Sequence, residues 1–208
     1  MKTIKVLIAD DHSVVRMGLA ALISAEDDIT VVGEAKNGEE AVRQASELKP
    51  NVVIMDLIMP RKDGAAATAE IMSSVPGTHV LILTSVGASD AIAKALDAGA
   101  SGAMMKDSPN SSLISAIRAV AAGKSAISPE VRRMIARDPP VDVLTPRQEE
   151  VLLSLTRGLT NRDIALLLSI SEDRVEQHIR ALLEKLGAAN RTEAVSIAFR
   201  KQLLKISW

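Results

Sequence analysis

The sequence predicts an α/β domain with a doubly wound, five-stranded parallel sheet, followed by a small all-α domain of four helices. Over residues 1–122, short apolar runs typical of buried strands alternate five times with stretches of helical period. After Gly123 the strand pattern stops, and four helix starts follow, each marked by a capping Thr, Ser or Asn. We therefore predict domains at 1–122 and 143–208, joined by a linker with a short helix at 123–142.

Each element has its own signal in the sequence. The expected strands are 4–9, 29–32, 52–55, 80–83 and 102–105, and the expected helices between them are 14–23, 39–48, 65–75, 90–98 and 113–121. In the second domain, helices are expected to begin after Thr145, Thr160, Ser171 and Asn190. A further short helix is expected over 129–137, ended by Asp138 and two prolines.

Composition excludes several classes of protein. The chain has 208 residues, of which 47% are hydrophobic and 25% charged, with a net charge of −1 and no cysteine. This hydrophobic and charged composition is typical of a globular protein with a hydrophobic core. Without cysteine, the chain can form neither a disulfide nor a thiolate zinc site. Aromatic residues make up only 1% of the chain, which excludes a surface that binds single-stranded nucleic acid by stacking on its bases. No secretory core or membrane span is recognisable, so we expect a cytoplasmic protein without a membrane partner.

Polar residues follow four of the five expected strands. Asp10 and Asp11 follow the first strand, and Asp56, Thr84 and Lys106 follow the third, fourth and fifth. Ligands of doubly wound sheets bind at the carboxyl ends of the strands, so these side chains are expected to share one crevice. Three carboxylates at close range repel one another and favour a bound cation, for which Mg²⁺ (or Mn²⁺) is the natural candidate.

The same residues suit phosphoryl chemistry. An Asp carboxylate can attack a phosphoryl group, while a Lys and a Thr hydroxyl hold the phosphoryl oxygens. Each residue taken alone also has a structural interpretation, because strand-end Asp and Thr often cap helices and a lone Lys is usually solvated. Their coincidence at matching strand ends favours the functional interpretation.

These residues resemble the receiver domain of bacterial two-component response regulators. The resemblance rests on Asp10-Asp11, Met55-Asp56-Leu57, Met59-Pro60, Asp63-Gly64, Leu83-Thr84-Ser85 and Lys106-Asp107. It implies a flavodoxin-like strand order 2-1-3-4-5. It also implies that Asp56 accepts a phosphoryl group from a sensor histidine kinase, without the protein being an enzyme beyond this self-directed step and slow dephosphorylation. The implied metal ligands are Asp11, Asp56, the nearby Asp10 and the Ile58 carbonyl, with Thr84 as switch hydroxyl and Lys106 as phosphate partner.

Two alternatives compete with this interpretation. Relatives usually carry an aromatic residue three positions before the Lys, where this chain has Ala103. A degenerate receiver with phosphorylation-independent DNA or protein binding therefore stays open. A phosphatase or mutase with an Asp nucleophile would need a second acid two residues later, where Ile58 stands.

A helix-turn-helix is expected over residues 160–186. On its second helix, Val175, Ile179, Leu182 and Leu186 share the side expected to face the core. The opposite stripe is polar. This arrangement places a recognition helix in a DNA major groove, although helical hairpins are also common in bundles without that role.

The second domain resembles the LuxR-type DNA-binding domain, and the whole chain is similar to the NarL/FixJ class of regulators. The motifs are 144–149, 158–165, 169–172, and 186–187 with 191–194. The resemblance implies double-stranded DNA as partner and a homodimer on activation. The candidate DNA contacts are Arg174, Glu176, Gln177, Arg180, Thr160, Asn161, Lys185, Arg191 and Thr192. Residues 143–208 hold ten basic and eight acidic side chains, a net of only +2, so affinity is expected to depend on dimerisation.

Overall fold

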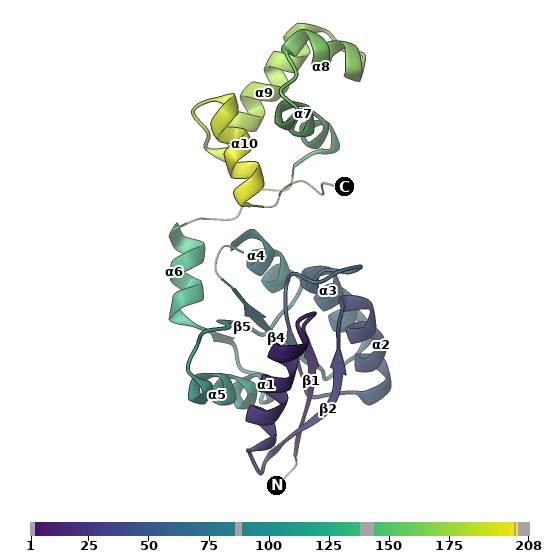
Figure 1. Cartoon of the computed structure of the whole chain (residues 1–208), viewed down its shortest axis with the longest axis vertical. Helices are drawn as coiled ribbons and strands as arrows, with labels where there is room; N and C mark the ends of the chain where they lie inside the picture. The colour runs from purple at the N-terminus through teal and green to yellow at the C-terminus, as the bar shows by residue number, and fades with distance from the viewer. Residues whose placement is uncertain (1–2, 86–88, 138–143, 202, 204–208) are drawn as a thin grey trace. The chain divides into compact units, whose positions relative to one another are not determined.

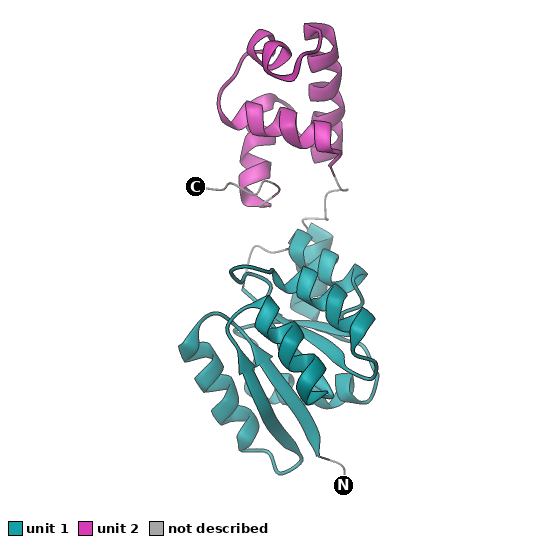
Figure 2. Cartoon of the chain, turned by 90° about the vertical axis from the view of Figure 1, so that its right-hand side faces the viewer, with its two compact units in different colours: residues 1–139 teal, residues 140–208 magenta. Residues whose placement is uncertain are grey.

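The computed structural model describes residues 3–85, 89–137, 144–201 and 203. Contacts between the residues divide the chain into two compact units, residues 1–139 and residues 140–208 (Figure 2). Each unit has its own hydrophobic core and is described by itself. Residues 138–143, on which the expected domain boundary falls, lie outside the described residues.

A parallel sheet forms the centre of the first unit (Figure 1). Its strands are β1 (Ile4–Ala9), β2 (Ile29–Ala35), β3 (Val52–Met55), β4 (His79–Thr84), β5 (Gly102–Met105) and β6 (Ala126–Ile127). The order is β2-β1-β3-β4-β5-β6, so the predicted order of the first five is confirmed. The inner strands are buried on both faces, which explains why they are continuous apolar runs.

Helices cover both faces of this sheet. They are α1 (Ser13–Ser24), α2 (Gly38–Leu48), α3 (Gly64–Ser74), α4 (Ser89–Asp97) and α5 (Asn110–Ala121). One core cluster joins α1 and α5 to one face of the sheet, and the other joins α2, α3 and α4 to the opposite face. This is the doubly wound arrangement that the alternating pattern predicts.

The expectation of five strands was wrong, because β6 adds a sixth. Ala126 and Ile127 pair with Gly102 and Ala103 of β5. Two residues are too few to show a strand period, so the sequence gives no signal for this strand. The short helix α6 (Pro129–Arg137) follows as expected, and its Val131 is buried in the core of the first unit. The described part of the expected linker thus packs on the first unit.

Four helices form the second unit: α7 (Pro146–Thr156), α8 (Asn161–Leu168), α9 (Glu172–Leu186) and α10 (Arg191–Arg200). All four predicted caps are confirmed, since the side chains of Thr145, Thr160, Ser171 and Asn190 each accept a hydrogen bond from a backbone N–H in the first helical turn. Within the described ranges, no helix combines the length and the apolar character needed to cross a membrane.

Candidate functional sites

Strand register brings the first two carboxylates together. β1 and β3 are neighbours, and Ala9 pairs with Met55, so the next residue on each strand is an aspartate, Asp10 or Asp56. The Asp56 backbone N–H donates to the Ala9 carbonyl at 2.8 Å, which continues the pairing to the end of the sheet. Both carboxylates are almost fully buried, with exposed fractions of 2% for Asp10 and 5% for Asp56.

The same logic places Thr84 and Lys106. Thr84 pairs with Met105 on the neighbouring strand, and its carbonyl accepts a 2.7 Å hydrogen bond from the Lys106 backbone N–H. Thr84 is buried, and its hydroxyl contacts the Ser85 carbonyl at 3.4 Å. The predicted gathering of side chains at the carboxyl ends of β1, β3 and β5 is therefore present, with Thr84 at the end of β4 between them.

Lys106 bridges the two buried carboxylates. Its Nζ lies 2.7 Å from Asp10 Oδ2 and 2.9 Å from Asp56 Oδ2. Burial alone would lower the pKa of the Lys106 ammonium, but the hydrogen bonds to both carboxylates outweigh burial and raise it. Burial raises the pKa of the Asp56 carboxyl, and the Asp10 charge adds to this against the opposing hydrogen bond from Lys106. The Lys106 ammonium therefore does not fully offset the burial of Asp56.

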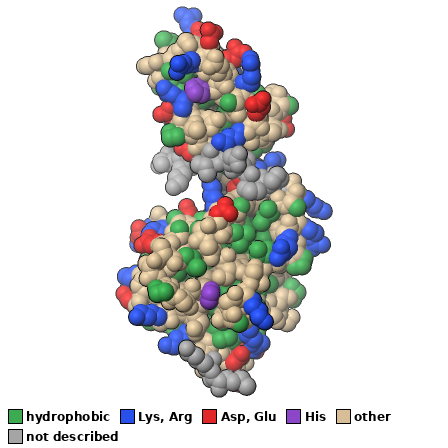
Figure 3. Space-filling view, turned by 180° about the vertical axis from the view of Figure 1, so that it is seen from behind, with side chains coloured by type: hydrophobic (Ala, Val, Ile, Leu, Met, Phe, Trp, Pro, Cys, Tyr) green, Lys and Arg blue, Asp and Glu red, His purple; other side chains and the backbone are tan. Residues whose placement is uncertain are grey.

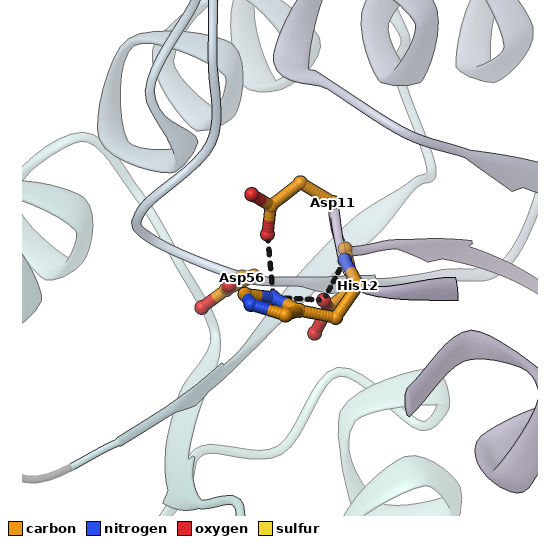
Figure 4. A group of neighbouring side chains, drawn as sticks. Asp11, His12 and Asp56 are labelled. Atoms are coloured by element: carbon orange, nitrogen blue, oxygen red, sulfur yellow. Dashed lines mark hydrogen bonds and ion pairs between the residues drawn. The ribbon is translucent and has the colours of Figure 1, made fainter. Parts of the chain in front are cut away.

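Asp11 and His12 complete a potential metal site with Asp10 and Asp56. One ligand atom from each of these four residues lies within 4.8 Å of the others. The Asp11 carboxylate points to the His12 imidazole, with 2.8 Å between Oδ1 and Nδ1 (Figure 4). The three carboxylates and the Lys106 ammonium leave two excess negative charges when all are ionised, which matches the charge of a divalent cation. The cluster is thus compatible with divalent metal binding. We call Asp10, Asp11, Asp56, Thr84 and Lys106 the acid site.

The loop after Asp56 is held close to it. Asp56 Oδ1 accepts a 2.8 Å hydrogen bond from the Leu57 backbone N–H, and the Gly64 N–H donates to the Leu57 carbonyl at 2.9 Å. A side chain at Gly64 would meet the Asp56 carbonyl oxygen at 2.0 Å, so only glycine fits here. Ile58 lies in this loop with its side chain about half exposed; the role of its carbonyl as a ligand stays a prediction.

One residue at this rim was not predicted, because no motif in the sequence assigns Arg16 a role. Arg16 lies on α1 and donates from Nη1 to the Asp10 carbonyl at 2.8 Å. Its only signal in the sequence is its place one helical turn beyond His12, from where a helical side chain points back toward the start of the helix.

The helix α9 presents a polar surface to solvent. Val175, Leu182 and Leu186 are buried as expected, and Ile179 is partly buried against the same core. We call the exposed residues on the other side the α9 surface, which comprises Arg174, Glu176, Gln177 and Arg180. Arg180 Nη2 lies 3.2 Å from Glu176 Oε1. Basic and acidic side chains are interspersed over the face of the second unit visible in Figure 3.

The remaining candidate DNA contacts lie on three other parts of this unit. Thr160 caps α8, where its hydroxyl lies 2.5 Å from Asp163 Oδ2. Arg191 donates to the Leu159 carbonyl at 2.6 Å. Lys185 lies near the end of α9, with Nζ 3.5 Å from Gln148 Oε1. Asn161 and Thr192 belong to the first turns of α8 and α10. Thr160 and Arg191 therefore have structural partners of their own.

Both units match known families of protein domains. Residues 6–118 match the response regulator receiver domain, and residues 142–198 match the bacterial regulatory proteins of the luxR family. The chain is 38% identical to the response regulator protein VraR of Staphylococcus aureus, over 98% of this chain and 100% of that protein.

Solved structures with both domains are also similar. The response regulator ChrA of a heme-sensing two-component system is 37% identical, with a TM-score of 0.60 over 98% of this chain and 100% of ChrA. RcsB from Salmonella enterica serovar Typhimurium, bound to the promoter P1flhDC in the presence of the phosphomimetic BeF3⁻, is 25% identical. Its TM-score is 0.71, over 96% of this chain and 99% of RcsB.

Proposed function

Because this chain belongs to the NarL/FixJ (LuxR-type) response regulators, phosphorylation-controlled transcription regulators of two-component systems, we propose that Asp56 is its phosphoacceptor and α9 its DNA-reading helix. Residues 1–122 would receive the signal and residues 143–208 would bind DNA. The phosphoryl donor would be a sensor histidine kinase. The protein catalyses no other reaction in this proposal than its own phosphorylation and dephosphorylation.

The chemistry follows from the groups around Asp56. A carboxylate oxygen of Asp56 attacks the phosphorus of a phosphohistidine, an O–P bond forms, and the N–P bond breaks. The electron pair of that bond leaves with the donor imidazole, which takes a proton from solvent. Lys106, 2.9 Å from Asp56 Oδ2, would keep the carboxylate ionised and then bind a phosphoryl oxygen. The Thr84 hydroxyl would donate to a second phosphoryl oxygen.

Asp10, Asp11 and Asp56, with the Ile58 carbonyl, would hold Mg²⁺ or Mn²⁺, which neutralises the phosphoryl oxygens when bound. The donor set fits this role, because its oxygen ligands are those that a hard divalent cation prefers. Asp10 also accepts a 2.8 Å hydrogen bond from the His12 backbone N–H, which orients its carboxylate toward the cluster.

The observation that carries this proposal is the contact of one ammonium with two buried carboxylates at adjacent strand ends. The test is intact-mass measurement after incubation with Mg²⁺ and a small acyl phosphate. One phosphoryl group should add to the wild type and to Asp97→Asn, an exposed control at the end of α4, and none to Asp56→Asn. A wild type without an adduct would overturn the phosphoacceptor role and favour a degenerate receiver that binds DNA or protein independently of phosphorylation.

DNA binding by a homodimer is the second part of the proposal. The ten basic and eight acidic residues of 143–208 supply a weak field for one domain, so a dimer that contacts two half-sites would gain affinity by linking them. RcsB, 25% identical to this chain, was solved as dimers bound to DNA, which supports this assembly here. A duplex should be selected from a random-sequence pool with the phosphorylated chain. Binding and sedimentation should then show a dimer on that duplex only after phosphorylation; a monomeric, phosphate-independent complex would contradict the proposal.

A further inference from the structure

We propose that Arg16 is a positioning residue that holds the Asp10-Asp11 backbone in the conformation that binds the metal. The proposal rests on the proposed function, because it assigns a role at the same acid site. It concerns a residue that touches neither the phosphoryl group nor the metal in that proposal.

The contacts of Arg16 tie three elements together. From the first turns of α1, its Nη1 donates to the carbonyl oxygen of Asp10 at 2.8 Å, at the point where the chain leaves β1. Its Nε lies 3.4 Å from Glu34 Oε2 on the neighbouring strand β2. The Arg16 side chain is mostly buried, with 17% exposed, so the guanidinium sits in a defined place between β1, β2 and α1.

The direction of this hydrogen bond matters more than the charge. Arg16 binds the peptide oxygen of Asp10 and leaves both Asp10 carboxylate oxygens to other partners, which are Lys106 Nζ and the His12 backbone N–H. A guanidinium paired directly with the Asp10 carboxylate would compete with a metal ion for its oxygens. A guanidinium that binds the Asp10 carbonyl oxygen leaves the carboxylate oxygens to the metal. Because the Asp10 carbonyl belongs to the peptide group that leads to Asp11, fixing it restrains the backbone from which both side chains project.

Mn²⁺ binding to the full chain tests this without any phosphorylation. Electron paramagnetic resonance of free Mn²⁺ gives the Kd for the wild type, for Arg16→Gln and for the conservative Arg16→Lys. Arg118→Gln is the control. Arg118 lies on α5, and its Nη2 is 2.6 Å from Glu26 Oε2 and 2.6 Å from Asp28 Oδ1, in a loop away from the acid site. This substitution removes an arginine that bridges two segments of the same unit, so it reports general loosening of the fold.

We expect Arg16→Gln to raise the Mn²⁺ Kd by about tenfold, the usual scale for losing a hydrogen bond from a charged donor. Arg16→Lys should recover part of this, and Arg118→Gln should match the wild type. In phosphorylation by a small acyl phosphate, Arg16→Gln should need more Mg²⁺ for half-maximal rate but reach the wild-type rate at saturation.

Equal Mn²⁺ affinity of Arg16→Gln and wild type would overturn the inference and leave the proposed function standing. So would an equal loss in Arg118→Gln, which would mean that Arg16 only stabilises the fold. A wild type that binds no Mn²⁺ would instead refute the metal site itself, and the role of Arg16 with it. The two failures are thus distinguished by whether the wild type or only the variant departs from expectation.

Discussion

The acid site and the α9 surface place their functional groups in opposite ways. In the acid site, Asp10, Asp56 and Thr84 are at most 5% exposed, and Lys106 contacts two of the other members. On the α9 surface, the side chains of Arg180 and Glu176 are 73% and 63% exposed, and their 3.2 Å contact is with each other. Buried groups are held by several neighbours at once, whereas exposed groups are held mainly by the helix that carries them.

This difference predicts which measurements each region controls. A substitution in the acid site changes the charge balance of a buried cluster, so chemistry and stability should change together. A substitution on the α9 surface leaves the core untouched, so DNA binding should change while stability stays. The following substitutions test this separation.

Lys106→Met should have the largest effect. It removes the ammonium that lies 2.9 Å from Asp56 Oδ2 and leaves two buried carboxylates facing each other. We expect phosphorylation by a small acyl phosphate at saturating Mg²⁺ to slow by roughly 100-fold, the scale for losing one preorganised donor to a developing phosphoryl charge. Intact-mass time courses measure this. Lys124→Met, an exposed control in the same unit, should react at the wild-type rate, and a wild-type rate for Lys106→Met would contradict the role of Lys106.

Gly64→Ala should disturb the acid site through its backbone. The new methyl group would lie 2.0 Å from the Asp56 carbonyl oxygen, so the loop must move. We expect a loss of about 1–3 kcal/mol in the free energy of unfolding of the first unit. Gly18→Ala is the matched control, because a methyl group there meets nothing within 4 Å, and in helix α1 it should stabilise by up to about 1 kcal/mol.

Urea unfolding, followed by hydrogen exchange in peptides from β3, measures the free energy of unfolding of the first unit in both glycine variants. Equal stability of Gly64→Ala and wild type would mean that the loop after Asp56 is adaptable. The acid site would then be less tightly constrained than its contacts indicate.

The acid site was predictable because parallel strands end together. Once strands 52–55 and 102–105 were recognised, register placed Asp56 and Lys106 at one edge of the sheet. Arg16 was not predictable in this way, because its contact with the Asp10 carbonyl depends on the direction of its side chain at the start of α1. The strand β6 was missed for a different reason, since two residues carry no period.

For α9, helical period predicted which residues are buried but could not assign DNA contacts. Val175 and Leu182 show a clear apolar stripe, and both are buried. The polar residues opposite them are all exposed, and exposure alone does not distinguish a base contact from a solvated side chain. The sequence therefore predicts the place of a residue well where packing against the core fixes it, and poorly where the residue only faces solvent.

Asp56→Asn should stabilise the metal-free protein at neutral pH. Burial raises the pKa of the Asp56 carboxyl above the ordinary value of an aspartate, 3.8, so the folded state favours the protonated form. The stability that this gives is complete below pH 3.8 and is lost as the pH rises through the raised pKa. As the pH rises through the raised pKa, Asp56→Asn should therefore become more stable than the wild type. Urea unfolding in the presence of a metal chelator measures this difference in the free energy of unfolding. No gain at neutral pH would mean that Lys106 compensates the ionised Asp56 fully.

Glu176→Gln should have the smallest effect on stability and a visible one on DNA. The pair with Arg180 is exposed, so its loss should change the free energy of unfolding by less than about 0.5 kcal/mol. The substitution removes one negative charge from the α9 surface and frees Arg180 for phosphate or base. We therefore expect binding to random-sequence duplexes at low salt to tighten several-fold, with a steeper dependence on salt concentration.

Glu184→Gln separates a local effect from a general charge effect, because Glu184 is also exposed on α9, two turns further along. If α9 enters the groove at the α9 surface, Glu176→Gln should gain more affinity than Glu184→Gln. Equal gains would mean that DNA responds only to the net charge of the second unit. On a selected duplex, a loss of affinity in Glu176→Gln alone would instead indicate that Glu176 accepts a hydrogen bond from a cytosine amino group, so that an exposed acid reads sequence.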